Sequence, residues 1–337
     1  MRPEHERSGR ATDFERHRAR LFGIAYRMLG SAADAEDVVQ DAYLRWHQAE
    51  SVRSAEAWLV AVVTRLSIDR LRRAAMEREA YEGNWLPEPI ATPAPDRNAE
   101  LASDLSMAFL VLLERLGAEE RAAFLLREVF GAPYAEIARV LGKSEAACRQ
   151  VVHRARARVR GEKRRHAAPA DGRERLVERF RTALSAEDED ALLALLAPDV
   201  VWVSDGGGKA PAARRVVSGA VRVARLAIGF QRMGRGRVAH EPAWINGEPA
   251  LLTLADGWTL FTTSFAIADG RITAVYRVLN PDKLRRVGPP PYLSAREDVS
   301  RRRDGPTQPS SCGPGPVSRS CSKLPCGAGA SARTTAV

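Results

Sequence analysis

The stretch VVWVSDGGGKAP, residues 200–211, places an acidic residue, three glycines and a lysine directly after a run of strand-forming residues. A glycine-rich loop binds phosphate when it follows the pattern G-x-x-x-x-G-K-S/T between a strand and a helix. Counted back from Gly208, the first glycine of that pattern falls on Val203, and the residue after Lys209 is Ala210. Two required positions are therefore wrong, and the loop does not predict nucleotide hydrolysis.

A second candidate chemistry is that of isomerases and cyclases, which use a carboxylate base and an acidic partner in an apolar pocket. Residues of suitable types are Asp205, His240, Asp256 and Tyr276. Their spacing does not bring them together, and a histidine on a strand is usually a surface residue or hydrogen-bonded. We therefore expect no enzyme, no catalytic residue and no cofactor. Three consecutive glycines favour instead a close approach of the backbone to a neighbour.

A basic helix gives the strongest chemical signal. Residues 149–165 contain eight Lys or Arg and one acid, Glu162. The segment YAEIARVLG, a glycine turn and SEAACRQVVHRARARVR form the layout of a helix-turn-helix, whose second helix enters the major groove of DNA. Arginine can pair with guanine and glutamine with adenine, and Cys148 belongs to the small core between the helices. The expected DNA contacts are Lys143, Ser144, Glu145, Arg149, Gln150, His153, Arg154 and Arg156.

Composition agrees with an anionic partner. Lys and Arg number 52 against 42 Asp and Glu, a formal net charge of +10, which favours nucleic acid or a membrane surface. No apolar run is long enough to span a membrane, and the N-terminus is too charged for a signal peptide. We expect a cytoplasmic protein without a membrane partner. Three of the four cysteines lie in the last 26 residues and form no paired zinc motif, so we expect no metal site.

The pattern along the chain divides it into five parts. Helical periodicity covers residues 12–80, with a capping box predicted at Ser31 and Asp34. Residues 81–100 contain four prolines and read as a linker that holds two helical domains apart, and residues 101–165 are helical again. Residues 173–287 predict an α+β domain, with helices at 173–184 and 187–196 and five strands joined in part by NG and DG hairpins. The tail, 288–337, is expected to be disordered, because 22 of its 50 residues are Pro, Gly or Ser.

Two long, ordered segments resemble the extracytoplasmic-function sigma factors of bacterial RNA polymerase. YRMLGSAADAEDVVQDAYLRW with AWLVAVVTRLSIDRLRR resembles their region 2, and ERAAFLLREVFGAPYAEIARVLGKSEAACRQVVHRARARVR resembles their region 4. The resemblance implies a protein that binds core polymerase through the β′ clamp helices and the β flap. It also implies recognition of the promoter −10 element by region 2 and of the −35 element by region 4.

The resemblance assigns roles to residues of region 2. The expected contacts to the β′ clamp helices are Asp34, Glu36, Asp37, Gln40 and Asp41. Read alone, these residues would be a solvated acidic helix face. The expected contacts to the −10 element are Arg53 and Ser54, in a loop that captures an unpaired base, and Arg65, Arg70, Arg72 and Arg73 along the strand backbone. Trp58 could stack on a base, but its spacing favours the core.

The chain continues for about 170 residues beyond region 4, as in a subgroup that carries a fused SnoaL-like domain. Three short signatures fit that subgroup: WLPEP in the linker, DGGGK in the extra domain and NPDKL at its end. We hypothesise that they stabilise one arrangement of regions 2 and 4, although they could be mere turns. The expected regulatory contacts are Trp85, Leu86, Pro87, Asp205, Gly206, Gly207, Gly208, Lys209, Asn280, Pro281 and Asp282.

The predicted architecture is therefore multidomain. Two all-α DNA-binding domains, a helical bundle and a helix-turn-helix, precede an α+β SnoaL-like domain with a curved, antiparallel sheet. The predicted function is a sigma factor that is modulated by its own C-terminal domain. Two alternatives stay open: a transcription regulator that binds duplex DNA without polymerase, and an enzyme that acts on an apolar cyclic substrate. A small-molecule ligand of the C-terminal domain is a further candidate partner.

Overall fold

The computed structural model describes residues 4–50, 52–94, 105–163, 170–234 and 236–289. The first helical domain is a bundle of α1 (Glu4–Leu29), α2 (Ala32–Gln48) and α3 (Ala55–Glu79). Serine side chains begin the second and third helices: Ser31 accepts a hydrogen bond from the Asp34 amide (3.2 Å), and Ser54 accepts one from the Ala57 amide (3.3 Å). These are helix N-caps of the usual type.

The second helical domain contains α4 (Met107–Leu113), α5 (Ala118–Glu128), α6 (Tyr134–Leu141) and α7 (Glu145–Lys163). Gly142 ends α6 in the left-handed conformation (φ 64°), which glycine adopts without steric cost. The helix-turn-helix predicted from the sequence is thus present as α6 and α7. Cys148 is fully buried in the apolar cluster between them, as expected of a small hydrophobic residue.

The two helical domains pack on each other, which corrects the expectation that the linker holds them apart. Helix α5 contacts α1 and α3 as well as α6 and α7. Its residues 121–126 are all buried, and Leu125 belongs to the same apolar core as Leu21 of α1 and Leu59 of α3. A helix that is apolar on more than one face must be covered on more than one side. The first domain covers the side of α5 that the helix-turn-helix leaves open.

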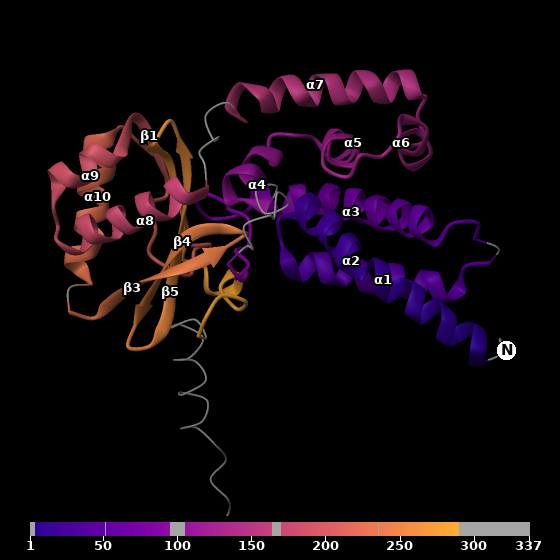
Figure 1. Cartoon of the computed structure of the whole chain (residues 1–337), viewed down its shortest axis with the longest axis horizontal. Coiled ribbons are helices and arrows are strands. Elements are labelled where there is room, and N and C mark those ends of the chain that lie inside the picture. Colours follow the sequence, from indigo (N-terminus) through magenta and orange to yellow (C-terminus); the bar gives the residue numbers. More distant parts are fainter. Residues whose placement is uncertain (1–3, 51, 95–104, 164–169, 235, 290–337) are drawn as a thin grey trace, which may run out of the picture.

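The C-terminal domain lies beside the helical domains, with α8, α9 and α10 on the far side of its sheet (Figure 1). Its helices are α8 (Ala170–Ser185), α9 (Glu189–Leu195) and α10 (Ala220–Met233). Its strands are β1 (Leu196–Asp205), β2 (Val217–Ser218), β3 (Val238–Ile245), β4 (Glu248–Ala255), β5 (Trp258–Ala268) and β6 (Arg271–Val278). The strand order is β2-β1-β6-β5-β4-β3.

Three hairpins of this sheet confirm the turn signals of the sequence. The pairs Asn246–Gly247, Asp256–Gly257 and Asp269–Gly270 all have positive φ at both residues, between 50° and 80°. That is the type I′ turn, which matches the twist of antiparallel strands. The strands that these turns join are antiparallel. The sheet is nevertheless mixed, because β1 pairs with β6 in parallel; the sequence also gave no signal for β2 or α10.

Both faces of the sheet are covered. One face packs on α8, α9 and α10, with Phe265 and Val275 in the core. The other face packs on α4 and the linker, where Ala266 and Tyr276 meet Met107 and Leu86. Because side chains alternate between faces, burial on both sides explains why eight successive residues of β5, 261–268, are buried. The second face of the sheet is therefore an interdomain interface.

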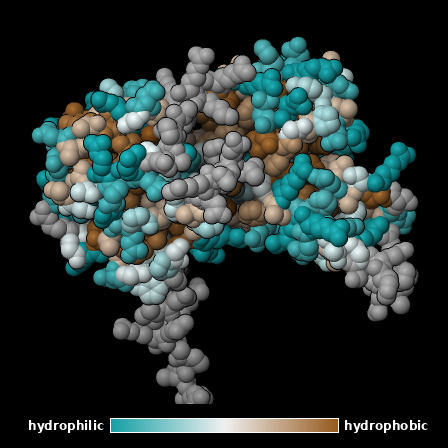
Figure 2. All heavy atoms as spheres, viewed as in Figure 1, coloured by the Kyte–Doolittle hydropathy of each residue, from teal (hydrophilic) through white to brown (hydrophobic). Residues whose placement is uncertain are grey.

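The described part of the linker, residues 81–94, runs along this interface. Leu86 is buried, and an isolated β-bridge joins Ala91 to Ile245 at the β3–β4 hairpin. On the face shown in Figure 2, hydrophilic residues cover most of the described surface. No helix in the described ranges is long and apolar enough to cross a membrane. The tail expected to be disordered lies, from residue 290 on, outside the described residues.

Candidate functional site

The start of α7 presents the expected base-reading residues to solvent. Ser144 caps the helix, since its Oγ accepts a hydrogen bond from the Ala147 amide at 3.2 Å. Arg149 lies on this surface, pairs with Glu145 at 3.3 Å, and stacks on the Tyr134 ring at 5.3 Å. The exposed members of the predicted set are Lys143, Ser144, Glu145, Arg149, Gln150, His153 and Arg154. Arg156 is half-buried and pairs with Glu128 at 2.5 Å. The structure thus places these residues along one exposed helix and the turn before it.

Three of the arginines expected at the −10 element make contacts with other residues of this chain, although their side chains are exposed or partly exposed. Arg65 donates to the carbonyl oxygens of Val140 (3.0 Å) and Arg139 (2.7 Å) at the C-terminus of α6. Arg70 binds the carboxylate of Asp34, and Arg72 pairs with Glu119 of α5 at 2.7 Å. Arg53, Ser54 and Arg73 are exposed. Two of the six expected contacts therefore hold the second helical domain against the first.

The acidic face of α2 contacts the C-terminal domain at one point. Glu36 accepts a hydrogen bond from Arg286 at 2.8 Å, and this contact lowers the pKa of the Glu36 carboxyl. Asp34 is held by Arg70, while the remaining expected polymerase contacts, Asp37, Gln40 and Asp41, are exposed. A partner that binds the whole face must therefore compete with Arg286 for Glu36.

The three signatures WLPEP, DGGGK and NPDKL meet in one place, around the carboxylate of Asp205. This side chain is 0% exposed. Tyr81 Oη donates to Oδ1 (2.6 Å), while the Leu86 amide (2.8 Å) and Lys283 Nζ (2.7 Å) donate to Oδ2. The amide of Asn280 donates to the Asp205 backbone carbonyl oxygen (3.0 Å), and its Nδ2 donates to Tyr81 Oη (2.9 Å). We call Asp205, Tyr81, Asn280 and Lys283 the Asp205 cluster.

The buried charges of Lys283 and Asp205 neutralise each other and are surrounded by hydrogen-bond partners. Lys283 Nζ also donates to the Leu86 carbonyl oxygen at 2.6 Å and lies over the Trp85 ring at 4.2 Å. Burial lowers the pKa of Lys283, an effect that Asp205 opposes. Burial and the hydrogen bond to Asp205 raise the pKa of Tyr81, so its hydroxyl stays protonated and donates. A buried ion pair is stable when its remaining hydrogen-bonding positions are also filled, as they are here.

The glycines after Asp205 allow the linker to come this close. Gly207 and Gly208 have φ of 56° and 70°. A β-carbon on Gly207 would lie 2.2 Å from Asn280 Nδ2 and 2.8 Å from Tyr81 Oη, and one on Gly208 would lie 2.7 Å from Glu82. A β-carbon on Gly206 would lie 2.2 Å from the Ala210 carbonyl oxygen. Lys209 and Asp282 form an exposed pair at 2.5 Å beside the cluster.

A second contact, missed in the sequence, joins the linker to α2. The Glu88 side chain of WLPEP is 5% exposed. Its Oε2 accepts from the amides of Ala32 (2.7 Å) and Ala33 (3.3 Å) and from Ser31 Oγ (3.3 Å). The predicted capping box was thus half wrong: Ser31 caps α2, but Asp34 binds Arg70. Glu88 supplies the additional carboxylate at the helix N-terminus, where negative charge is favourable.

Asn246 completes this contact from the C-terminal domain. Its Oδ1 accepts from the Ile90 amide (2.7 Å), and its Nδ2 donates to Tyr26 Oη (2.7 Å), which itself donates to the Glu88 carbonyl oxygen (2.6 Å). The sequence identified Asn246 only as a hairpin residue. The sequence offered two signals, a glutamate between two prolines and an NG turn. Neither signal indicates the residues with which Glu88 and Asn246 form hydrogen bonds. We call Glu88, Asn246 and Tyr26 the Glu88 cluster.

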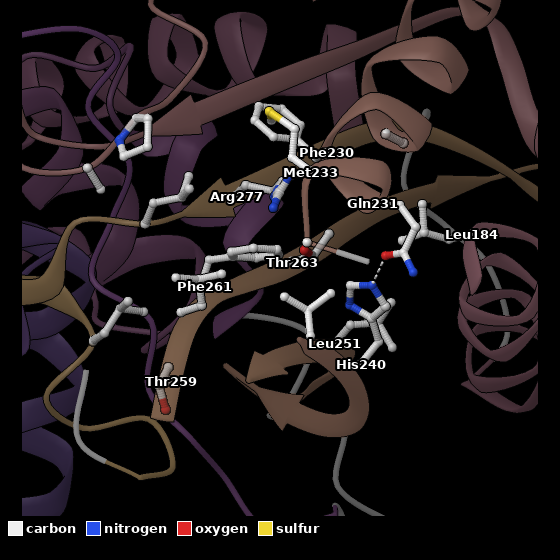
Figure 3. A pocket seen from close by; sticks show the side chains of 18 of the residues that line it. Leu184, Phe230, Gln231, Met233, His240, Leu251, Thr259, Phe261, Thr263 and Arg277 are labelled. Carbon is white, nitrogen blue, oxygen red and sulfur yellow. Dashed lines mark hydrogen bonds between the residues drawn. The ribbon is translucent and has the colours of Figure 1, made fainter. Parts of the chain in front are cut away.

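A cavity of about 400 Å³ lies inside the C-terminal domain, between the sheet and helices α8 and α10. Its wall is largely aromatic and aliphatic, and its polar members include His240 and Arg277. Figure 3 shows His240 directed at Gln231, with Nε2 2.7 Å from Oε1; its Nδ1 lies 2.8 Å from Thr253 Oγ1. Of the four residues considered for catalysis, only His240 is among the residues that line the cavity.

Comparison with known proteins identifies the helical domains. The family model of Sigma-70 region 2 matches residues 14–76, and that of Sigma-70 region 4 matches residues 106–159. The ECF RNA polymerase sigma factor SigJ of Mycobacterium tuberculosis strain H37Rv is 42% identical over 287 residues, covering 81% of this chain and 92% of SigJ. The chain belongs to the extracytoplasmic-function (ECF) sigma factors. A probable ECF sigma factor of the same species, SigI, is 32% identical over 280 residues, or 80% of this chain and 92% of SigI.

The solved structure of SigJ extends the likeness to three dimensions. The crystal structure of Mycobacterium tuberculosis SigJ matches the structure of this chain with a TM-score of 0.68 at 38% sequence identity. The match covers 81% of this chain and 98% of the SigJ chain. The order of the elements expected from the sequence is confirmed: two sigma regions are followed by an α+β domain. As a sigma factor, the protein binds core RNA polymerase and promoter DNA and directs initiation of transcription.

His240 gives the sigma factor a predicted pH dependence of stability. Burial, reinforced by Arg277 and Arg181, lowers its pKa from 6.5 to about 4. The unfolded chain therefore binds a proton between pH 6.5 and pH 4 that the folded protein does not, so stability falls as the pH is lowered through this window. Because the ring is partly exposed, we expect a loss of about 1 kcal/mol between pH 7.5 and pH 5.

Urea unfolding at both pH values measures this loss. The variant His240→Gln should lose about 1 kcal/mol less than the unsubstituted chain over the same interval. The matched control is His153→Gln, at an exposed position of α7, which shows what removal of an exposed histidine does in the same measurement. An identical pH dependence in the unsubstituted chain and in His240→Gln would contradict this prediction.

Proposed function

We propose that this sigma factor is held in a closed state by its own C-terminal domain, and that it must open to bind a promoter. The observation that carries this proposal is the Asp205 cluster. One buried carboxylate there joins the linker between regions 2 and 4 to the C-terminal domain. The Glu88 cluster supports it, because it fixes the other end of the same linker segment between α2 and the β3–β4 hairpin.

The distance between the two promoter elements supports the proposal that regions 2 and 4 separate before they bind a promoter. The numbers in their names place the −10 and −35 elements about 25 base pairs apart, which is about 85 Å of duplex at ~3.4 Å per base pair. Helix α3 has 25 residues, which corresponds to a length of only about 38 Å. In the closed state, Arg65 of region 2 binds the end of α6 in region 4. Regions 2 and 4 cannot reach both elements while they stay in this contact.

The composition of the interface agrees with a contact that opens. Thr262 and Ser264 of β5 are buried on the face toward α4, and their hydroxyl oxygens have no hydrogen-bond partner among the described residues. Burying an unpaired hydroxyl costs about 1–3 kcal/mol. Opening would hydrate both groups, so this interface is weaker than an entirely apolar interface of the same area.

We assign the separate surfaces as follows. The start of α7 reads the −35 element, and the exposed residues Arg53, Ser54 and Arg73 contact the −10 element. Opening frees Arg65 and Arg72 to join them, and Arg70 joins when it leaves Asp34 of the same region. Region 2 binds the β′ clamp helices through the acidic face of α2, and region 4 binds the β flap. The Glu36–Arg286 pair supports a link between the C-terminal domain and polymerase binding, because both use the same carboxylate.

The C-terminal domain acts in this proposal as a binding and control module rather than as an enzyme. Asp205 is fully engaged in its cluster, and Asp256 lies in a hairpin turn. His240 is neutral and hydrogen-bonded on both ring nitrogens, so the cavity holds no pair of groups for proton transfer. The place of action is the cytoplasm, where core polymerase works.

Promoter-directed transcription with purified core polymerase tests the control function. The full-length chain, a chain that ends at Arg165 and the full-length variant Asp205→Ala are compared at equal concentration. Loss of the Asp205 contacts frees the linker, so we expect Asp205→Ala to transcribe about tenfold or more above the unsubstituted chain. The chain ending at Arg165 should differ from both. Equal activity of all three would contradict the proposed control.

A further inference from the structure

Arg277 of β6 lies buried in the cavity of the C-terminal domain, and the described residues provide no counter-ion for it. It is 3% exposed, and its guanidinium lies 3.5 Å from the ring centroid of Phe261, 4.6 Å from that of Phe230 and 5.1 Å from that of Trp202. Figure 3 shows it between Phe230 and Phe261. Its Nε has no hydrogen-bond partner, and neither a hydrogen bond nor an ion pair joins its other nitrogens to a residue in the described ranges.

The cavity therefore carries one positive charge. Burial lowers the pKa of Arg277 to about 9, so its guanidinium stays charged at neutral pH. His240 is neutral there, because burial and the nearby arginine lower its pKa to about 4. Aromatic faces attract a cation, but they do not provide the acceptors that five N–H donors require. A buried charge that lacks a partner is unfavourable unless a bound anion provides one.

The rest of the cavity defines the body of the molecule that would fit. Its wall is formed mainly by apolar side chains, among them Leu184, Trp202, Met233 and Leu251. A volume of about 400 Å³ is within the range of sites for small organic molecules. An amine would be repelled by Arg277, and a neutral apolar molecule would leave the guanidinium unpaired. A doubly charged phosphate would exceed the single positive charge present.

We propose that the C-terminal domain binds a small, mostly apolar monocarboxylate in this cavity, with its carboxylate paired to Arg277. A guanidinium matches a carboxylate in geometry, since two parallel N–H groups can bind its two oxygens. The aromatic and aliphatic wall encloses the rest of the molecule. The cavity borders the Asp205 cluster, because Pro281 and Leu284 of the NPDKL segment also line it. This ligand-binding proposal does not depend on the proposed control of transcription by the domain.

Calorimetric titration of the full-length chain tests the site with matched probes. Three carboxylates of different shape are used: naphthylacetate, cyclohexylbutanoate and decanoate. Each is compared with the alcohol and the amine of the same carbon skeleton. At least one carboxylate should bind about tenfold or more tightly than its alcohol, and the amine should bind most weakly. If none of the three carboxylates exceeds its alcohol, the proposal is overturned.

Variants locate the binding in the cavity. Arg277→Met should remove the preference for the carboxylate, whereas Arg277→Lys should retain part of it. The matched control Arg225→Met changes an arginine on α10 that is 70% exposed and pairs with Glu189, and it should bind like the unsubstituted chain. Leu251→Phe reduces the cavity and should weaken every probe. A carboxylate preference that survives both Arg277→Met and Leu251→Phe would place the binding elsewhere and refute the site.

Discussion

Replacement of Asp205 by alanine is expected to destabilise the closed arrangement by about 3–5 kcal/mol, because it leaves the ammonium of Lys283 buried without its anion. Lys283 is 13% exposed and its ion pair with Asp205 spans 2.7 Å. The same change removes the acceptors of the Tyr81 hydroxyl and the Leu86 amide. Urea unfolding gives the size of the loss, and native-state hydrogen exchange of residues 81–94 shows where the chain opens.

The matched control is Asp282→Ala, at the third residue of the NPDKL segment and next to Lys283. Asp282 pairs with Lys209, and both side chains are about half exposed, at 47% and 57%. An exposed pair of this kind contributes about 1 kcal/mol or less. Equal losses in the two variants would show that burial of Asp205 has no energetic role. The double variant Asp205→Asn with Lys283→Met removes both charges and should recover part of the stability.

Replacement of Glu88 by alanine is expected to cost about 2–3 kcal/mol and to loosen α2 from the linker. The carboxylate accepts hydrogen bonds from two backbone amides and one hydroxyl at the start of α2. Hydrogen bonds to a charged, buried acceptor are among the stronger hydrogen bonds in proteins. Without them, the first turn of α2 loses its additional cap, and the adjacent acidic face should become more mobile. Urea unfolding and hydrogen exchange of residues 31–37 measure the two effects.

Two variants separate charge from general disturbance of the linker. Glu88→Gln keeps one acceptor oxygen and should lose roughly half as much stability as Glu88→Ala. Glu82→Ala removes an exposed glutamate of the same linker, whose pair with Arg214 spans 2.6 Å with both side chains more than half exposed. It should cost about 1 kcal/mol or less. A loss in Glu82→Ala as large as that in Glu88→Ala would argue against a specific role for Glu88.

The linker couples the three domains through the Asp205 cluster and the Glu88 cluster. The Asp205 cluster holds its first part on the C-terminal domain, and the Glu88 cluster holds its second part between α2 and the β3–β4 hairpin. A segment fixed at two points couples three domains, so a change at either point can alter the contact between regions 2 and 4. The losses in unfolding free energy caused by Asp205→Ala and Glu88→Ala should therefore not add up in the double variant, because both residues hold the same linker segment.

Elements whose signals are local could be predicted from the amino-acid sequence. The glycine turn and the apolar periodicity of residues 134–159 predicted the helix-turn-helix, and NG and DG pairs predicted three hairpins that the structure contains. The basic residues of α7 are exposed as expected. Such features follow from backbone preferences and side-chain period over a few residues, so they can be read without knowledge of the rest of the chain.

Features that depend on partners distant in sequence became visible only in the folded chain. Asp205 is predicted to take part in a regulatory contact, but the sequence indicates neither its complete burial nor its partners Tyr81 and Lys283, which lie 124 and 78 residues away. The resemblance predicts that Arg65 contacts DNA, and only the folded chain shows that it also binds carbonyl oxygens of α6. The two-residue strand β2 and the parallel β1–β6 pair are equally non-local. Burial and ion pairing depend on long-range packing, which no local pattern specifies, and for this reason the closed state, its buried carboxylates and the charged cavity appear only in the folded chain.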